Sequence, residues 1–435
     1  MSVFHEEIEK VQHWEGLKVS GRVTQVIGLL IESVGPTVSL GELCHVYNKY
    51  GDMVPCEVVG FKENKVLLMS LGVMDHISPG SEVYPVGKSH KVPVGRGMCG
   101  RVIDALGNPL DGKGPIIADA YYPVMAPPPQ ALHRTRIEEP MALGIKALDG
   151  LCTVGRGQRL GIFSGSGVGK SVLLGMMAKM AKADVNVIAL IGERGREVRE
   201  FIDKNLGPEG LKRSVVVVVT SDQEALLRSK GANVAMAVAE FFRDEGLEVL
   251  FMMDSVTRYA MALREIGLAV GEPPTTRGYT PSVFAHMPKL LERAGTSDKG
   301  SITGIFTILV EGDDLNDPVA DTVRSIIDGH IILSRKMASS NHYPAIDVLQ
   351  SLSRVMTDVV DLEHYNVASK FRDMLQVYRD AEDLINIGAY AAGSNPKIDR
   401  ALSLVDKMTG FLRQDFFEFV EYDETKRLMK AIIES

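Results

Sequence analysis

The 435-residue sequence has few cysteines, and they lie far apart. There are four, Cys44, Cys56, Cys99 and Cys152. No two of them form a C-x-x-C pair, so the spacing of a cysteine-based metal site is missing. We therefore expect free, buried thiols in a protein that works in a reducing compartment.

Long apolar runs are also missing, and we expect the first residues not to be a secretory signal. No apolar stretch approaches the ~20 residues that a membrane-spanning helix needs. The opening MSVFHEEIEK contains glutamates and no apolar core, unlike a secretory signal. Basic residues are not in excess, because the formal net charge is -8, which disfavours a nucleic-acid partner. We expect a cytoplasmic protein.

The first third of the chain divides into three segments. Residues 1–17 predict a helix with an apolar stripe, Phe4, Ile8 and Val11 followed by Trp14, which could pack on the protein or bind a partner. Residues 18–90 alternate short valine-rich runs with glycine and proline, as in a small antiparallel barrel or sandwich. Residues 91–144 are rich in turn signals at 105–112 and 127–129 and predict a surface linker leading into the next domain.

Residues 145–346 alternate apolar strands, loops and helices. Most of the strands are continuous apolar runs, as expected for a parallel sheet covered on both faces in a doubly wound α/β domain. The expected strands are 159–163, 185–191, 214–220, 249–253, 302–310 and 330–333. Residues 347–435 lack strand runs and predict a mainly helical C-terminal domain, with helical spacing at 365–387.

The segment GIFSGSGVGKS at 161–171 is typical of a phosphate-binding loop, although Ser164 replaces the first glycine of the usual pattern. A strand precedes it and a helix follows it. Backbone N–H groups of such a loop point at phosphates, and Lys170 should reach the β and γ phosphates of ATP. The hydroxyl of Ser171 should bind Mg²⁺. The predicted nucleotide-binding residues here are Gly165, Ser166, Gly167, Val168, Gly169, Lys170, Ser171 and Val172.

Two carboxylates follow other strands of the same domain. Asp254 is the last residue of the apolar run VLFMMD. In related sites, the acidic residue that positions Mg²⁺ also stands at the end of an apolar strand. Glu193 follows the strand at 185–191, where a carboxylate can orient an attacking water. The guanine-specific N-K-x-D motif is missing, so ATP is favoured over GTP.

Together these motifs resemble the rotary ATPases, and within them the type III export ATPases, which are similar to the catalytic β subunit of F1. The strings that carry the resemblance include TVGRGQRLGIFSGSGVGKS, IGERGREV, MDSVTRYA, GEPPTTRGYTPSVF, LVEGDDLNDPVADTVRSIIDGHIILSR and YPAIDVLQSLSRVM. The resemblance implies a RecA-like P-loop ATPase core with an N-terminal small β-barrel and a C-terminal helical domain. It also implies a homohexameric ring.

The resemblance assigns roles to individual residues. The implied catalytic residues are Glu193 as the catalytic carboxylate, Lys170, Arg194, Arg258 near the γ-phosphate, and Arg354 as an arginine finger given to the neighbouring subunit. The implied metal site consists of Ser171, Asp254 and Glu197. Three aromatic residues are expected at the adenine, Tyr343, Phe411 and Phe417, although the last two could equally belong to the helical core.

The branch and partners are also implied by resemblance. LVEGDDLNDP and the string IGAY at 387–390 favour a flagellar export ATPase over one from an injectisome, the alternative. Implied partners are a stator-like regulator at residues 1–17, export chaperones, unfolded substrates and an export gate at the inner membrane. Two distant alternatives are an RNA-translocating ring helicase, which the acidic composition disfavours, and a non-catalytic nucleotide-binding subunit, which Glu193 disfavours.

Overall fold

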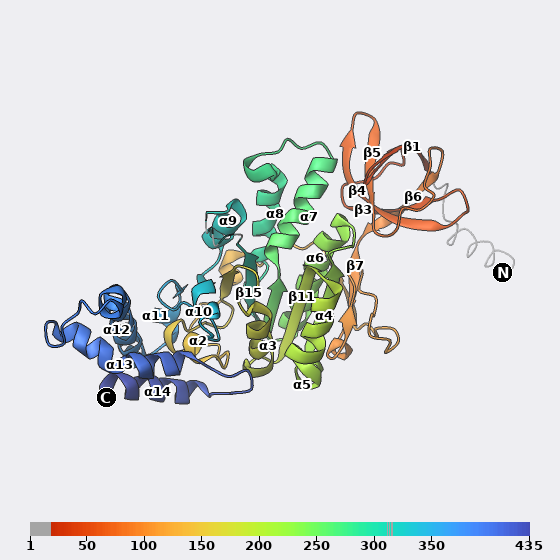
Figure 1. Ribbon diagram of the computed structural model, residues 1–435. Helices are drawn as coiled ribbons and strands as arrows, with labels where there is room; N and C mark the ends of the chain where they lie inside the picture. Colours follow the sequence, from red (N-terminus) through yellow and green to blue (C-terminus); the bar gives the residue numbers. More distant parts are fainter. Residues whose placement is uncertain (1–18, 311, 313, 315) are drawn as a thin grey trace, which may run out of the picture. The chain divides into compact units, whose positions relative to one another are not determined.

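The computed structural model describes residues 19–310, 312, 314 and 316–435, which form two compact units (Figure 1). One unit contains the described residues up to 90 together with 265–273, and the other contains 91–264 and 274–435. The helix expected at 1–17 lies outside the described residues. No helix in the described part of the chain is both long and apolar enough to cross a membrane.

The first unit is a closed antiparallel barrel with strand order β1-β2-β5-β4-β3-β6. Side chains alternate between the barrel interior and its surface, as the period of a strand requires. Val23, Ile31, Cys44, Val46 and Cys56 fill the interior. The strands are β1 (Gly21–Ile27), β2 (Leu30–Val34), β3 (Glu42–Tyr47), β4 (Met53–Lys62), β5 (Lys65–Ser70) and β6 (Glu82–Ser89). The prediction of an antiparallel barrel is confirmed.

The second unit is built on a nine-stranded sheet whose central strands are parallel. Its order is β17-β16-β10-β15-β13-β11-β12-β8, where β17 is Leu352–Ser353 and β8 is Val102–Ile103, and β14 (Gly295–Thr296) is paired to β15. The six strands expected from the sequence are all present: β10 (Arg159–Ser164), β11 (Val185–Glu193), β12 (Ser214–Thr220), β13 (Glu248–Asp254), β15 (Ser301–Leu309) and β16 (Gly329–Leu333). The doubly wound α/β prediction is therefore confirmed.

Helices cover both faces of this sheet, so that its strands are buried on two sides. One apolar core includes α6 (Ala225–Asp244) and α8 (Pro281–Leu291), and the other includes α3 (Lys170–Met180) and α2 (Lys146–Leu151) (Figure 1). The other α-helices and one π-helix of this region are α4 (Gly195–Glu200), the π-helix (Phe201–Leu206), α5 (Gly207–Lys212), α7 (Val256–Ala269), α9 (Pro318–Ile326) and α10 (Arg335–Ser339).

The expected surface linker is partly a structural element of the core. β7 (Lys91–Val94) pairs with β9 (Ala120–Pro123), and β8 (Val102–Ile103) extends the large sheet in parallel beside β12. Val92, Val94 and Ile103 are completely buried in one of the two cores. The segment does contain turns, as predicted. The apolar runs between them are short, and burial of their side chains in the core stabilises them as strands.

The C-terminal region is helical, as predicted. Its helices are α11 (Met356–Val359), α12 (Leu362–Asn386), α13 (Pro396–Leu412) and α14 (Tyr422–Glu434). Helices α12, α13 and α14 pack on α2, so that this region shares a core with the nucleotide-binding half of the sheet. Contrary to expectation, one short strand, β17 (Leu352–Ser353), lies beyond residue 347 and pairs antiparallel with β16.

Candidate nucleotide-binding and catalytic site

The phosphate-binding loop connects β10 to α3 at one edge of the sheet. Gly167 and Gly169 have φ angles of 76° and 90°, in the left-handed region that glycine adopts without strain. Gly169 caps the helix, and Lys170 is the first residue of α3. The loop thus presents the free N–H groups of a helix N-terminus, which favour a phosphate.

Lys170 meets both predicted carboxylates. Its Nζ pairs with the carboxylate of Asp254 and lies 3.9 Å from Oε1 of Glu193. The three residues follow or end β10, β13 and β11, which are parallel, so their carboxyl ends meet at the same edge. Thr307 of β15 donates a 2.9 Å hydrogen bond to Asp254 and fixes that carboxylate. The predicted residues are therefore brought together.

The side chain of Glu193 is largely buried beside the charged groups of Lys170 and Asp254. Its side chain is 13% exposed, and Oε1 has no hydrogen-bond partner among the described residues. Burial raises the pKa of Glu193 to about 7, with a further increase from the negative charge of Asp254, and Lys170 opposes the rise. A buried carboxylate with one unpaired oxygen can accept a hydrogen bond from a water molecule and orient it.

Arg258 reaches this site because Gly192 has no side chain. Gly192 has a φ of 70°, and a Cβ built on it would lie 2.8 Å from the Cβ of Arg258. The charge of Arg258 lowers the pKa of Glu193, and its buried Nε has no partner among the described residues. Gly192 is thus a positioning residue that the sequence analysis missed, although its place before Glu193 in the GERGRE string was visible.

Arg194 and Glu197 border the cluster and are more open to solvent. The Arg194 side chain is 73% exposed, and its guanidinium lies 3.4 Å from the carboxylate of Glu197. A hydrogen bond between Glu197 and Glu193 contributes to the raised pKa of Glu193. Glu197 therefore joins the site, whereas Arg194 points into solvent at its rim.

The residues present suit a magnesium nucleotide. Among the described residues there is no cluster of three or more His, Cys, Asp or Glu that could hold a metal. Mg²⁺ needs no such cage, because it keeps several waters and binds through substrate phosphates and one or two protein oxygens. Ser171 at the start of α3 and Asp254 at the end of β13 can supply those oxygens.

A cavity of about 690 Å³ adjoins the phosphate-binding loop and would hold the base. Gly167, Gly169 and Val172 line it on the loop side, and Tyr343 lines it on the other. The Tyr343 ring lies so close to Gly169 that a Cβ there would be 3.3 Å from its Cε1. Tyr343 therefore lines a cavity next to the loop, and its contact with adenine stays a prediction.

The other aromatic wall of this cavity is Phe416, which the sequence analysis did not select. Phe411 instead is 5% exposed and packs on Phe371 in the helical core, with ring centroids 5.4 Å apart. It ends up there because α13 turns its apolar face towards α12. Phe417 is 83% exposed and is not among the residues that line the cavity. Phe411 therefore packs in the helical core, and Phe416 is the phenylalanine that lines the cavity.

Arg354 is placed away from the site of its own chain. It is exposed and follows β17, and its N–H donates to the carbonyl of Asp328, just before β16 begins. This is the amino end of the parallel strands, whereas Lys170 and Glu193 lie at their carboxyl ends. The structure therefore does not bring Arg354 together with the other predicted catalytic residues.

The fold and this site define a P-loop nucleotide-binding protein. Comparison with family models matches residues 144–353 to the ATP synthase alpha/beta family nucleotide-binding domain, 23–87 to its beta-barrel domain and 360–431 to the T3SS EscN ATPase C-terminal domain. The chain is 55% identical to a flagellum-specific ATP synthase of Bacillus subtilis, over 94% of this chain and 93% of the relative. It is 49% identical to a type 3 secretion system ATPase of Xanthomonas euvesicatoria, over 95% and 93%.

The structural comparison agrees. The assembled ATPase EscN from the enteropathogenic E. coli type III secretion system matches with a TM-score of 0.91 and 43% identity, over 95% of this chain and all of the other. EscN in complex with its central stalk EscO matches with a TM-score of 0.88 and 42% identity, over the same shares. The chain therefore belongs to the ATPase family of the flagellum-specific ATP synthases and type 3 secretion system ATPases.

Proposed function

We propose that this protein hydrolyses MgATP to energise the export of flagellar proteins through a type III secretion apparatus. The observation that carries the proposal is the buried carboxylate of Glu193 beside Lys170 and Asp254. Bound Mg²⁺ would neutralise phosphate charge, with Ser171 and Asp254 holding it and its waters. Glu193 would orient a water molecule for attack on the γ-phosphorus, and Lys170 would leave Asp254 to pair with the phosphates.

The active form is proposed to be a homohexameric ring with six shared sites. Arg354 lies at the opposite end of the strands from Glu193 of the same chain, so it suits the site of a neighbour. Such a finger supplied in trans is worth on the order of 10³–10⁵ in rate in related phosphoryl transfer. That EscN was solved as an assembled ATPase supports this proposal.

The flagellar branch is favoured over the injectisome branch. A flagellum-specific relative is 55% identical to this chain and two type 3 secretion system ATPases are 49% identical, although other flagellum-specific relatives are 45–50% identical. We propose that the protein is cytoplasmic and lies at the cytoplasmic face of the inner membrane. Its proposed partners are an export gate, chaperones and unfolded substrates. A stator-like regulator would bind at residues 1–17. A neighbouring gene cluster of injectisome components would instead favour the alternative.

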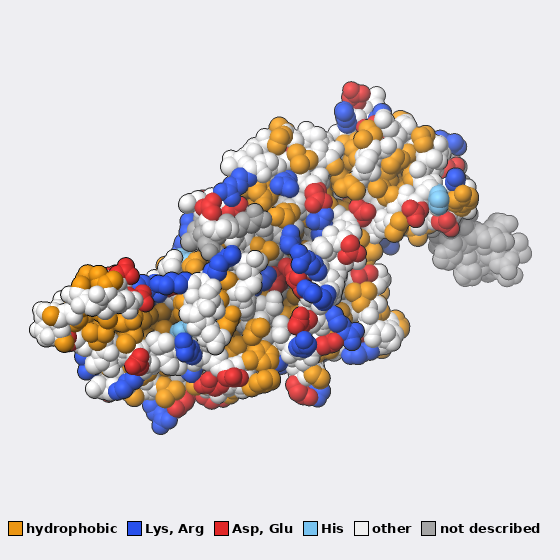
Figure 2. All heavy atoms as spheres, viewed as in Figure 1, with side chains coloured by type: hydrophobic (Ala, Val, Ile, Leu, Met, Phe, Trp, Pro, Cys, Tyr) orange, Lys and Arg blue, Asp and Glu red, His pale blue; other side chains and the backbone are white. Residues whose placement is uncertain are grey.

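Two other functions fit less well. An RNA-translocating ring helicase would need a basic surface, but Lys and Arg side chains lie intermixed with Asp and Glu on the face shown in Figure 2, and the net charge is -8. A non-catalytic nucleotide-binding subunit has no need of a buried carboxylate at the end of β11. Stimulation of the ATPase by RNA would support the helicase.

The ring proposal is tested by measuring ATPase activity per chain against protein concentration, with the oligomeric state determined by sedimentation at each concentration. We expect the specific activity to fall as the ring dissociates, because each site loses the Arg354 of its neighbour. A constant specific activity down to a demonstrated monomer would contradict the shared site. No hydrolysis at any concentration would contradict the ATPase proposal itself.

A further inference from the structure

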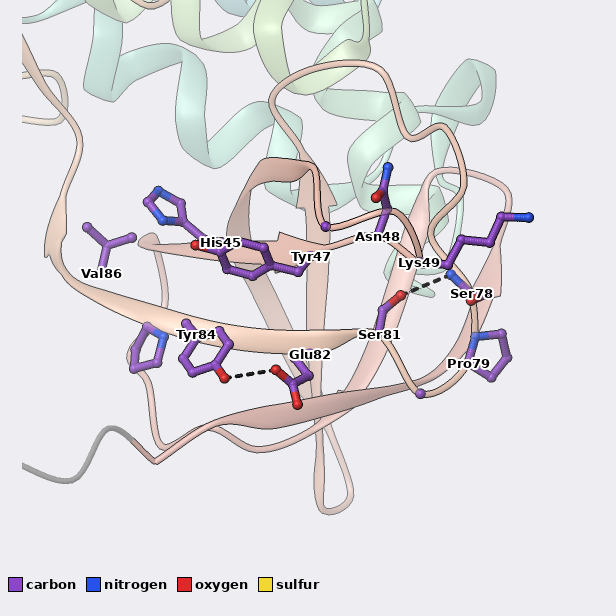
Figure 3. Close-up of a pocket in the computed structure, with 13 residues that line it drawn as sticks. His45, Tyr47, Asn48, Lys49, Ser78, Pro79, Ser81, Glu82, Tyr84 and Val86 are labelled. Carbon is purple, nitrogen blue, oxygen red and sulfur yellow. Dashed lines mark hydrogen bonds between the residues drawn. The ribbon is translucent and has the colours of Figure 1, made fainter.

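The barrel has an open cavity of about 1090 Å³ that takes no part in nucleotide binding (Figure 3). It lies on the outer surface of β3 and β6 and on the turns that precede β6 and follow β3. Residues that line it include His45, Tyr47, Lys49, Pro79, Glu82 and Tyr84. All of them belong to the barrel unit, so the cavity can be considered by itself.

Two tyrosine rings form an aromatic surface in this cavity. Tyr47 and Tyr84 lie on neighbouring strands with ring centroids 5.6 Å apart and planes at 89°. The hydroxyl of Tyr84 donates a 2.8 Å hydrogen bond to Glu82, as Figure 3 shows. Pro79 and Pro85 add flat apolar surface. Such a site suits a planar apolar group with a polar edge, because edge-to-face aromatic contacts then combine with hydrogen bonding.

The chain enters the barrel at the rim of this cavity. Among residues 19–90, β1 pairs with β6 only at Gly21 with Val83 and at Arg22 with Glu82, although β6 continues to Ser89. In an antiparallel register the residue before Gly21 lies opposite Tyr84. In agreement with this register, a hydrogen bond from the side chain of Ser20 acts to lower the pKa of Tyr84. Ser20, the residue just before β1, therefore lies beside Tyr84.

The N-terminal segment carries a side chain of the required kind. Residues 1–18 lie outside the described part of the chain, and their sequence includes Trp14, the only tryptophan. Trp14 precedes Ser20 by six residues, a span of about 20 Å at full extension and about 9 Å in a helix. An indole combines a large apolar surface with one N–H donor.

We propose that the barrel cavity is the docking site of the chain's own residues 1–18, with Trp14 inserted beside Tyr47 and Tyr84. This inference is independent of the proposed export function, because it rests only on the barrel. The point of entry beside the cavity favours the chain's own segment over another occupant, since a tethered group has a high effective concentration there. A partner that binds the apolar stripe of residues 1–18 would first have to displace it.

The fluorescence of Trp14 in the full-length chain tests the proposal, because no other tryptophan contributes. Excitation is restricted to tryptophan, and the emission maximum and acrylamide quenching are measured in the native chain and after unfolding in urea. We expect a blue-shifted, poorly quenched emission in the native chain. The double variant Tyr47→Ser/Tyr84→Ser should shift the emission to longer wavelength and increase quenching.

Tyr50→Ser is the matched control. Tyr50 is an exposed tyrosine next to the cavity that does not line it, so its replacement should leave the Trp14 emission unchanged. Circular dichroism establishes that each variant is folded. A native emission like that of the unfolded chain would overturn the proposal without need of any variant. An emission that shifts on dilution would show a second copy as the occupant and would also overturn it.

Discussion

Glu193 and Arg354 lie at opposite ends of the parallel strands within one chain. Glu193 ends β11 at the carboxyl edge of the sheet, and Arg354 is hydrogen-bonded through its N–H to Asp328 at the amino edge. Residues of one site that cannot meet within a chain can meet between chains when a ring places one face of a subunit against the opposite face of the next. If both residues act in one site, as proposed, a single chain would not supply all the catalytic residues of that site.

Replacement of Glu193 by glutamine should separate binding from turnover. The amide keeps the size of the side chain and leaves Lys170 paired with Asp254, but it cannot act as a base. We expect kcat to fall by about 10²–10⁴-fold, with the dissociation constant for MgATP nearly unchanged. Binding of a fluorescent ATP analogue beside a steady-state ATPase assay measures both. Full-rate hydrolysis by this variant would refute the assignment of Glu193.

The departure of the phosphate-binding loop from the usual pattern should have little effect on activity. Ser164 is buried at the end of β10, and its hydroxyl has no partner among the described residues. Ser164→Gly therefore removes no hydrogen bond and leaves Gly167 and Gly169 in place. We expect ATPase activity within about twofold of the wild type. A large loss at unchanged folding would reveal a role for the Ser164 hydroxyl in the loop.

Two aromatic residues five positions apart should differ in their effects. Phe416→Ala removes a wall of the base cavity and should weaken ATP binding about tenfold, since stacking of a base on an aromatic ring is worth ~1–3 kcal/mol. Phe411→Ala empties a core position and should lower the free energy of unfolding by about 3–5 kcal/mol. Titration with ATP and urea unfolding measure the two effects. The reverse pattern would restore Phe411 to the cavity.

The sequence predicted the strands and the loop that carry the catalytic residues better than it predicted the aromatic residues of the base cavity and the short strands at the edge of the sheet. Continuous apolar runs marked the strands that end at Glu193 and Asp254, and the glycine pattern marked the loop before Lys170. The string FLRQDFF at 411–417, by contrast, does not indicate which ring faces the base, because that depends on where α13 ends and on how it packs against α12. Short runs such as the one at Val102 were likewise assigned to a linker, because pairing with a distant strand leaves no local signal.

A buried histidine should make the C-terminal region sensitive to acid. His364 of α12 shares hydrogen bonds with the carbonyl of Gly150, at 2.8 Å, and with the hydroxyl of Tyr422, at 3.2 Å. Burial lowers the pKa of His364 below its ordinary value. Below about pH 6.5 the unfolded chain therefore binds a proton that the folded chain does not, so stability falls as the pH falls towards the folded-state pKa.

Hydrogen exchange of α12 amides at about pH 7.5 and about pH 5.5 measures this effect. His364→Gln keeps a side chain able to form hydrogen bonds but has no group that titrates in this range. Its loss of protection between the two pH values should be smaller than that of the wild type. Equal losses in both proteins would show that other groups cause the acid sensitivity.

The most direct test of the shared site mixes two inactive variants. Glu193→Gln and Arg354→Ala should each hydrolyse ATP very slowly alone. In rings assembled from equal amounts of both, about a quarter of the sites combine an intact Glu193 with an intact Arg354 from the neighbour, and activity should return in proportion. Activity no greater than the sum of the two variants, in rings shown to contain both, would contradict the account.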